Sequence, residues 1–211
     1  SSAVLGVKPA TEYEFRLFAS PVGPYFKDGV KPLTLRVTDY DRAAPHGTGH
    51  VKGGLNYAMS MRAITEAHAL GYDENMYLDA ATRTKVEEAG GANFIFVTKD
   101  QHIVTPRSSS ILPSITRRSI MTIAREYLNL ETEEREVDLD EVADFAECGL
   151  CGTAAVISPV GRLVDHERTI DFPSGMEQMG PITQQLYDTL TAIQHGRLPA
   201  PEGWLYEIKE Q

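Results

Sequence analysis

Basic side chains, cysteines and long apolar runs are all scarce in this sequence of 211 residues. Its 20 lysines and arginines are outnumbered by 30 aspartates and glutamates, and the formal charge of -10 repels phosphate backbones and anionic lipid. Nucleic acid and membranes are therefore not expected as partners. No apolar run reaches the roughly 18 residues of a spanning helix, and the first residues lack the pattern of a signal peptide. We expect a cytoplasmic location.

Only two cysteines are present, Cys148 and Cys151. Two are too few for a disulfide scaffold, which agrees with a reducing compartment. Their Cys-x-x-Cys spacing invites a redox or a zinc interpretation. A structural zinc needs four ligands, however, and the sequence offers no second cysteine pair and no His-x-His cluster. We predict no metal site.

Apolar residues make up 42% of the chain, which is enough for a substantial core. Alternating apolar and polar side chains predict strands, and apolar spacings of three and four predict helices. Because strands and helices follow one another without a regular strand–helix–strand order, the sequence indicates an α+β fold. The expected strands are 12–19, 32–38, 74–78, 93–97, 102–105 and 153–160, and the expected helices are 55–70, 116–128, 138–146 and 181–195.

Two prolines and a glycine between positions 21 and 24 forbid a continuing strand ladder. We expect residues 20–31 to connect two structural units. The first unit would be reduced to residues 1–19, and the second would comprise residues 32–211.

Four short segments carry side chains suited to chemistry. Lys52 precedes two glycines at the start of an expected helix, where a lysine can be desolvated enough to act as an amine nucleophile. Glu87 and Glu88 open an expected glycine-bearing turn at residues 87–91. Residues 112–118 open a helix whose free N–H groups can cradle a phosphate. Residues 148–155 form a turn that can also present N–H groups to an anion.

Each segment taken alone has an ordinary structural explanation, such as a solvated loop lysine, a polar hairpin, a helix cap or a pair of buried thiols. Taken together, in this order and at these separations, they resemble the class IV pyridoxal-phosphate aminotransferases. The prolines at 21–24 and the tail at 175–204 narrow the resemblance to branched-chain amino acid aminotransferases, over essentially the whole chain. The matching residues are Lys52 with Asn56-Tyr57, Glu88-x-Gly-x-x-Asn93, Leu112-Pro113-x-Ile115-Thr116-Arg117 and Gly152-Thr153-Ala154-Ala155.

The resemblance implies a D-amino-acid-aminotransferase-like fold, fold type IV, whose large domain is a mixed sheet or pseudo-barrel with flanking helices and binds pyridoxal 5'-phosphate (PLP). Lys52 would hold PLP as a Schiff base and shuttle the substrate α-proton. Tyr57 would hydrogen-bond the phenolic oxygen of PLP. Glu88 would pair with the pyridine nitrogen, where a carboxylate favours the protonated ring.

The same resemblance assigns the phosphate and the substrate. The N–H groups at Thr153-Ala154 would take the substrate carboxylate, and Tyr25 would wall the side-chain pocket. The PLP phosphate would be held by residues of three segments, with the last of them as an outer contact: Ile115 and Thr116, Thr153, and Arg42.

The family also implies a smaller N-terminal domain, of which residues 1–19 would be a remnant strand, and a homodimer. The intact enzyme would exchange the amino group of Leu, Ile or Val with 2-oxoglutarate, so its partners would be amino acids and 2-oxo acids. The chain alone is expected to be inactive. The alternatives are a D-amino acid transaminase or an aminodeoxychorismate lyase on the same fold, or an inactive PLP-fold module that binds a partner or senses thiol oxidation through Cys148 and Cys151.

Overall fold

The computed structural model describes residues 6–21 and 30–206, which form a nine-stranded mixed sheet, three α-helices and one short 3-10 helix. The helices are α1 (Gly54–Ala69), α2 (Ile115–Glu126), α3 (Pro181–Gln194) and the 3-10 helix η1 (Leu139–Asp144). The strands are β1 (Leu33–Val37), β2 (Glu74–Leu78), β3 (Val86–Ala89), β4 (Asn93–Val97), β5 (Ile103–Pro106), β6 (Thr132–Arg135), β7 (Glu147–Gly152), β8 (Val156–Asp165) and β9 (Arg168–Asp171).

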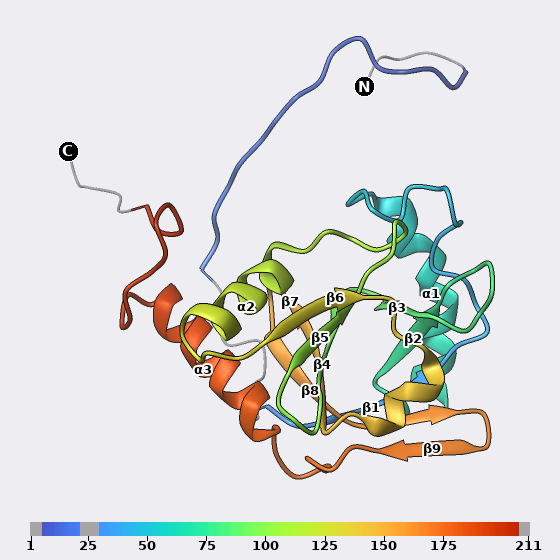
Figure 1. Cartoon of the computed structure of the whole chain (residues 1–211). Helices are drawn as coiled ribbons and strands as arrows, with labels where there is room; N and C mark the ends of the chain where they lie inside the picture. The colour runs from blue at the N-terminus through green and yellow to red at the C-terminus, as the bar shows by residue number, and fades with distance from the viewer. Residues whose placement is uncertain (1–5, 22–29, 207–211) are drawn as a thin grey trace.

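The sheet closes on itself (Figure 1). Its strands are hydrogen-bonded in the order β3-β2-β1-β8-β7-β4, and a further pairing of β3 with β4 joins the two ends into a barrel. Strands β5 and β6 continue the sheet from β4, and β9 pairs with β8. β1 lies parallel to both β2 and β8, whereas β7 is antiparallel to β4 and to β8. This mixed barrel with helices around it confirms the expected fold class.

Alternation along the barrel strands sorts the apolar side chains into two layers. On β4, Phe94 and Phe96 lie in a core formed with β1, β2, β3, β7 and β8. Ile95 and Val97 point the other way and pack with α2 and α3. Because both faces of β4 are covered, all five of its residues are buried, and the sequence there is an almost unbroken apolar run.

The helix α1 packs on β2 through small residues. Ser60, Ala63 and Ala67 are buried on one side of this helix, while Leu55 and Met59 remain 79% and 55% exposed. Gly71, with φ of +86°, ends the helix as the sequence predicts, because this left-handed conformation suits glycine. None of the described helices is long and apolar enough to cross a membrane.

Two turns lie elsewhere than the sequence indicates. Residues 148–152, expected as a turn, belong to β7, and the turn comprises residues 153–155. Glu87 and Glu88, also expected in a turn, belong to β3, and the chain bends at residues 90–91 instead. In both places a strand continues through polar or glycine-bearing sequence because it has a bonded neighbour on each side.

The expected strand at 12–19 is wrong for the chain as described. This segment pairs with no strand among the described residues and stands away from the barrel as an extended trace (Figure 1). Phe15 and Phe18 are 89% and 88% exposed. The apolar alternation is present, but nothing in the described structure covers it. The expected connector at 20–31 falls mostly in residues 22–29, outside the described part.

A buried carboxylate ties α3 to the barrel. Glu147, the first residue of β7, is 4% exposed. Its Oε1 accepts a hydrogen bond from the N–H of Ile182 at 3.0 Å, and its Oε2 accepts from the N–H and the hydroxyl of Thr183 at 2.8 and 2.6 Å. The carboxylate thus caps the first turn of α3, where the helix has N–H groups without helical acceptors. Gly180 is needed beside it, since a Cβ there would collide with the Glu147 carboxyl group.

Replacement of this cap should be costly. We expect Glu147→Ala to lower the free energy of unfolding by roughly 2–4 kcal/mol, because three buried donors lose their acceptor. Urea denaturation followed by circular dichroism measures the change. Glu133→Ala is the matched control: its ion pair with Arg135 is largely exposed, and its loss should cost less than about 1 kcal/mol. Equal losses in the two variants would contradict the capping role.

Candidate active site

A cavity of about 390 Å³ opens where four connections of the fold meet: the loop before α1, the bend between β3 and β4, the segment leading into α2, and the turn between β7 and β8. Of the residues expected at a site, Thr116 is buried within α2 and does not line this cavity, and Tyr25 lies outside the described residues. The expected residues that do line it are Arg42, Lys52, Tyr57, Glu88, Ile115, Thr153 and Ala154.

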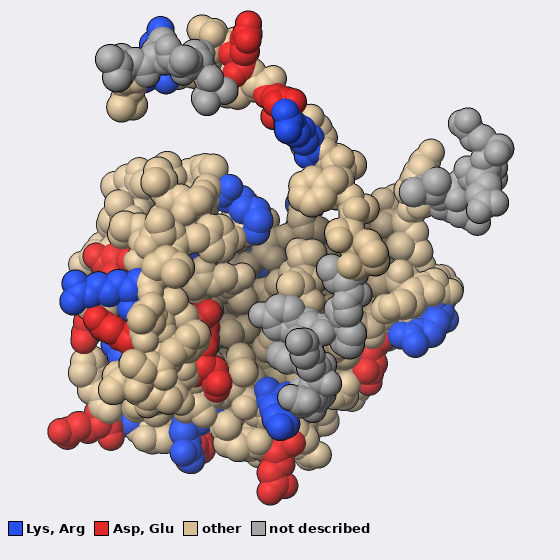
Figure 2. Space-filling model, turned by 180° about the vertical axis from the view of Figure 1, so that it is seen from behind, with Lys and Arg blue, Asp and Glu red and all other residues tan. Residues whose placement is uncertain are grey.

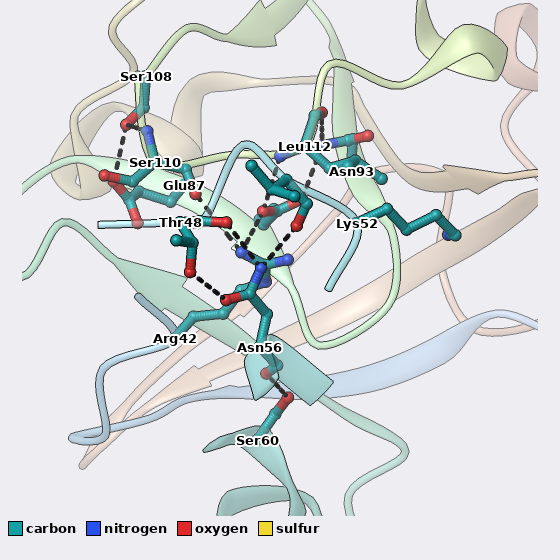
Figure 3. A network of polar contacts seen from close by, with 12 residues as sticks. Arg42, Thr48, Lys52, Asn56, Ser60, Glu87, Asn93, Ser108, Ser110 and Leu112 are labelled. Atoms are coloured by element: carbon teal, nitrogen blue, oxygen red, sulfur yellow. Dashed lines mark hydrogen bonds and ion pairs between the residues drawn. The ribbon is translucent and has the colours of Figure 1, made fainter. Parts of the chain in front are cut away.

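The amine of Lys52 is held at the edge of the cavity. Its Nζ lies 3.0 Å from the hydroxyl of Tyr57, in the first turn of α1, and both side chains are exposed. The loop that carries Lys52 is fastened by Asn56, whose Nδ2 donates to the carbonyl oxygens of Thr48 and Val51 at 2.9 and 2.8 Å. The asparagine of the sequence motif therefore fixes the backbone that presents the lysine. Figure 3 shows Lys52 extending from this loop and Asn56 turned back toward Thr48.

A buried carboxylate faces the same cavity. Glu88 is 2% exposed, and its Oε1 accepts from the N–H of Leu112 at 3.0 Å and from Nη1 of Arg42 at 2.6 Å. Its Oε2 accepts from Nδ2 of Asn93 at 2.9 Å. Burial raises the pKa of Glu88 to about 7, with the Arg42 charge and the Leu112 N–H acting in the opposite direction. The carboxyl group can therefore hold or release a proton near neutral pH.

The neighbouring Glu87 does not compete for this position. Its Oε1 accepts from the Ser108 hydroxyl at 2.8 Å, and the residue does not line the cavity. Burial raises the pKa of Glu87 as well. Of the two adjacent carboxylates that the sequence offers, Glu88 is the one that faces the cavity.

The opposite wall presents donors to an anion. Ser114 caps α2, and its hydroxyl accepts from the N–H of Arg117, which leaves the N–H groups of Ile115 and Thr116 among those without a helical acceptor. Ile115 is exposed at the cavity and Thr116 is buried behind it. Thr153, in the turn between β7 and β8, lines the same cavity. A helix start and a threonine turn on one cavity form a chemically suitable phosphate cradle.

The arrangement around Glu88 includes partners that the sequence analysis did not assign. Asn93 bridges the carboxylate and the carbonyl oxygen of Leu112, the latter at 3.2 Å, and so joins β4 to the segment before α2. Arg42, expected as an outer phosphate contact, lines the cavity and forms an ion pair with Glu88. The spacing of Glu88 and Asn93, which pair across β3 and β4, was the available signal for the first contact. The second joins positions far apart in the sequence, which no local pattern marks.

The two thiols lie on opposite faces of β7. Cys148 packs inside the barrel, whereas Cys151 packs beneath α2 and α3 and lines the cavity. Three residues of strand span about 10 Å, beyond the roughly 7 Å between Cα atoms that a disulfide tolerates. Burial raises the pKa of both thiols, that of Cys151 to about 12. This geometry is incompatible with the alternative in which the pair senses oxidation by forming a disulfide.

On the face shown in Figure 2, lysine and arginine side chains are interspersed with aspartate and glutamate over a largely uncharged surface. The excess of acidic residues does not form a field of one sign on that face. Among residues 6–21 and 30–206, no group of three or more His, Cys, Asp or Glu side chains is placed to hold a metal ion.

Comparison with known proteins places this chain in a family. A model described as amino-transferase class IV matches residues 2–163, well over half of the sequence, and the chain belongs to this family of class IV aminotransferases.

Among curated proteins of this family, the relatives described next are branched-chain-amino-acid aminotransferases. The chain is 50% identical over 206 residues to the branched-chain-amino-acid aminotransferase of Helicobacter pylori, a match that covers 97% of this chain and 59% of the relative. It is 49% identical over 210 residues to the enzyme of the same name from Haemophilus influenzae, covering 97% and 61%. The chain thus spans less than two thirds of the length of these relatives.

Solved structures agree with this placement. The branched-chain amino acid aminotransferase of Thermobaculum terrenum in its PLP form has 35% identity and a TM-score of 0.70, covering 80% of this chain and 52% of that chain. The Escherichia coli branched-chain amino acid aminotransferase has 30% identity and a TM-score of 0.75, covering 86% and 58%. The fold expected from the resemblance is confirmed.

The position of the cysteines predicts their reactivity. In the folded chain, Cys148 and Cys151 should both resist a thiol reagent such as 5,5'-dithiobis(2-nitrobenzoate), because both are buried with raised thiol pKa values. In denaturant both should react. Absorbance measures the count, and intact mass after mild oxidation should show two free thiols. A mass lower by two hydrogens, with the link mapped to these residues, would contradict the strand geometry.

Proposed function

We propose that this chain is the PLP-binding part of a branched-chain amino acid aminotransferase, which exchanges the amino group of Leu, Ile or Val with 2-oxoglutarate. One observation carries the proposal. A single cavity combines the amine of Lys52, 3.0 Å from a phenolic hydroxyl, with the buried carboxylate of Glu88 and the open start of α2. The names of the curated relatives support the choice of substrates.

The donor set fits PLP in each of its parts. A primary amine suits its aldehyde, a buried carboxylate suits its ring nitrogen, and a helix start with a threonine suits its phosphate. When bound, PLP supplies an electron sink for the negative charge that develops at the substrate Cα. The solved relative from Thermobaculum terrenum is described as a PLP form.

The residues would divide the tasks. Lys52 would hold the cofactor through its amine until the substrate amine takes its place, and the freed Nζ would then accept the proton that the substrate Cα loses, with the Tyr57 hydroxyl beside it to hold the amine in place. Glu88 would hold a proton between its carboxylate and the ring nitrogen. Thr153 and Ala154 offer N–H groups to the substrate carboxylate, and Ile115, Thr116 and Thr153 offer donors to the phosphate.

The exposed residues of the N-terminal segment support the domain assignment that we propose. Tyr13, Phe15 and Leu17 alternate along one side of an extended segment and are 85%, 89% and 87% exposed. Such a stripe is typical of a strand whose neighbour belongs to another unit. We assign residues 1–19 to the smaller domain of the enzyme, 20–31 to the connector and 32–211 to the large domain. Tyr25, in the connector, is proposed to wall the substrate side-chain pocket.

We also propose a homodimer, supported by the exposed apolar residues Leu55 and Met59 on α1. The cytoplasm is the proposed location, and the two free, buried thiols agree with a reducing compartment. Other compartments occur in the family, since a relative from Humulus lupulus with 43% identity is named chloroplastic. The D-amino acid transaminase and aminodeoxychorismate lyase alternatives have no counterpart among the relatives named above.

Covalent labelling tests the assignment of the lysine. After incubation with PLP and reduction with borohydride, peptide mapping should find the cofactor on Lys52. Lys52→Ala should abolish the label, whereas Lys99→Ala, a change of an exposed lysine far from the cavity lining, should leave it intact. Labelling of a different lysine in the wild-type chain would refute the proposed role of Lys52.

The affinity for PLP should be lower than that of a full-length relative. A polypeptide of these 211 residues spans 59% of the length of the Helicobacter pylori enzyme, so it can supply only the contacts made from within that span. Each charge-assisted hydrogen bond lost corresponds to roughly 10- to 150-fold in affinity. Titration with PLP, followed by absorbance, should therefore show weak binding and negligible transamination. Affinity and turnover equal to those of the full-length relative would show that the remaining part is dispensable for the site.

A further inference from the structure

Arg42 is a buried cation whose guanidinium contacts the carboxylate of Glu88. It follows β1 and is 4% exposed. Its Nη1 is 2.6 Å from Oε1 of Glu88 and 3.4 Å from the carbonyl oxygen of Ser110. Figure 3 shows Arg42 directed into the network that also contains Asn93 and Leu112.

We propose that Arg42 is a positioning residue, which favours the ionised form of the Glu88 carboxyl group and fixes it in the cavity so that it can hold a protonated ring nitrogen. This inference rests on the proposed function, because the ring belongs to PLP. Arg42 would then act on the reaction only indirectly, through its effect on Glu88.

The surroundings of Glu88 show why such a residue is required. Burial favours the neutral carboxylic acid, and the charge of Glu87 acts in the same direction. The N–H of Leu112 and the charge of Arg117 favour the ionised form. Arg117, however, is already paired with Glu134 at 3.0 Å and donates to a backbone carbonyl. The remaining neighbours are neutral: the Asn93 amide and the thiol of Cys151, whose raised pKa keeps it protonated.

Arg42 is therefore the principal cation for Glu88. An opposite charge at hydrogen-bond distance lowers the pKa of a carboxyl group by about 1–3 units, and more effectively where water is excluded. Without Arg42, the carboxyl group would stay protonated at neutral pH. It could then share only a neutral hydrogen bond with a ring nitrogen.

The loop after Arg42 is packed closely against Ser110. A Cβ at Gly49 would collide with the backbone carbonyl of Ser110, so glycine is needed for this close approach. Ser110 in turn donates through its hydroxyl to the carbonyl oxygen of Pro45 at 3.3 Å. Two contacts thus hold the loop after Arg42 against Ser110. The carbonyl oxygen of Ser110 also accepts the hydrogen bond from the Arg42 guanidinium.

The ion pair with Glu88 is made by Nη1 of the Arg42 guanidinium. The Nε of Arg42 is buried and has no hydrogen-bond partner among the described residues. A lysine can therefore replace the charge at Nη1 in part, while a methionine keeps only the apolar stem. This difference supplies a graded series: Arg42→Lys retains a cation and Arg42→Met removes it.

The titration of Glu88 in the PLP-free chain tests the proposal. Glutamates are labelled with 13C at the side-chain carboxyl, and the Glu88 signal is identified as the one missing in Glu88→Gln. We expect Arg42→Met to raise the pKa of Glu88 by about 1–3 units and Arg42→Lys to give an intermediate value. Arg162→Met, which breaks a half-exposed ion pair with Asp171, should leave the Glu88 titration unchanged.

Folding is checked on the same samples by circular dichroism and urea denaturation. Should Arg42→Met be too unstable to titrate, a double-mutant cycle with Glu88→Gln replaces the titration. Glu88→Gln in the Arg42→Met background should then restore stability, since the uncompensated buried carboxyl group is gone. Additive losses in the cycle would overturn the proposal.

A role of Arg42 in binding phosphate predicts a different outcome of the same experiment. If Arg42 serves the phosphate instead, Arg42→Met weakens binding of inorganic phosphate and leaves the Glu88 pKa where it was, which overturns the proposal. Because the titration needs neither PLP nor turnover, it is independent of the lysine labelling. A raised Glu88 pKa with PLP found on another lysine would reject the proposed function while leaving the Arg42–Glu88 coupling established.

Discussion

The buried contact of Arg42 with Glu88 is the constraint on which the site depends. It joins the loop after β1 to β3, and the other two hydrogen bonds of the same carboxylate join β3 to β4 and to the segment before α2. Four pieces of chain that are distant in sequence are thereby held at one point. A charge buried this deeply is stable only with such partners, so the loops cannot move apart without leaving it uncompensated.

The barrel explains how these pieces come together. The wall from β3 through β4 to β7 places the bend after β3 beside the turn after β7, since both strands neighbour β4. The helices α2 and α3 cover the outer side of that wall, and Glu147 fixes the start of α3 against it. Loops at one end of a doubly covered sheet can then carry polar groups while the packed strands supply rigidity.

Sequence patterns predict the doubly buried and amphipathic elements of this fold well. The strands 74–78 and 93–97 match β2 and β4 residue for residue, and the apolar run of β4 reflects the burial of both its faces. The edge strands β6 and β9, with sequences TEER and RTID, were not predicted, since they are solvated and carry no apolar alternation. The alternation at 12–19 predicted a strand that the described chain does not form, because a strand also needs a neighbour.

The site was predictable as a set of positions and not as a set of contacts. Lys52, Tyr57, Glu88 and Thr153 were found because family motifs mark them, and the cavity contains all four. The partner of Arg42 was not found, since its ion pair with Glu88 depends on how two distant loops are packed. The same limit applies to Cys148 and Cys151: their spacing suggested a pair, while the pleat of β7 turns them to opposite faces.

The parallel pairing of β1 with β8 has a consequence for how the protein is made. Residues 33–37 leave the ribosome before the other strands of the barrel, yet their partners on one side, residues 160–164, are among the last parts of the barrel to be synthesised. Until then one edge of β1 has no ladder to join, and the Phe94 and Phe96 core has no complete wall. Such long-range closure is slow, and an open apolar edge during translation is the state that chaperones recognise and aggregation exploits.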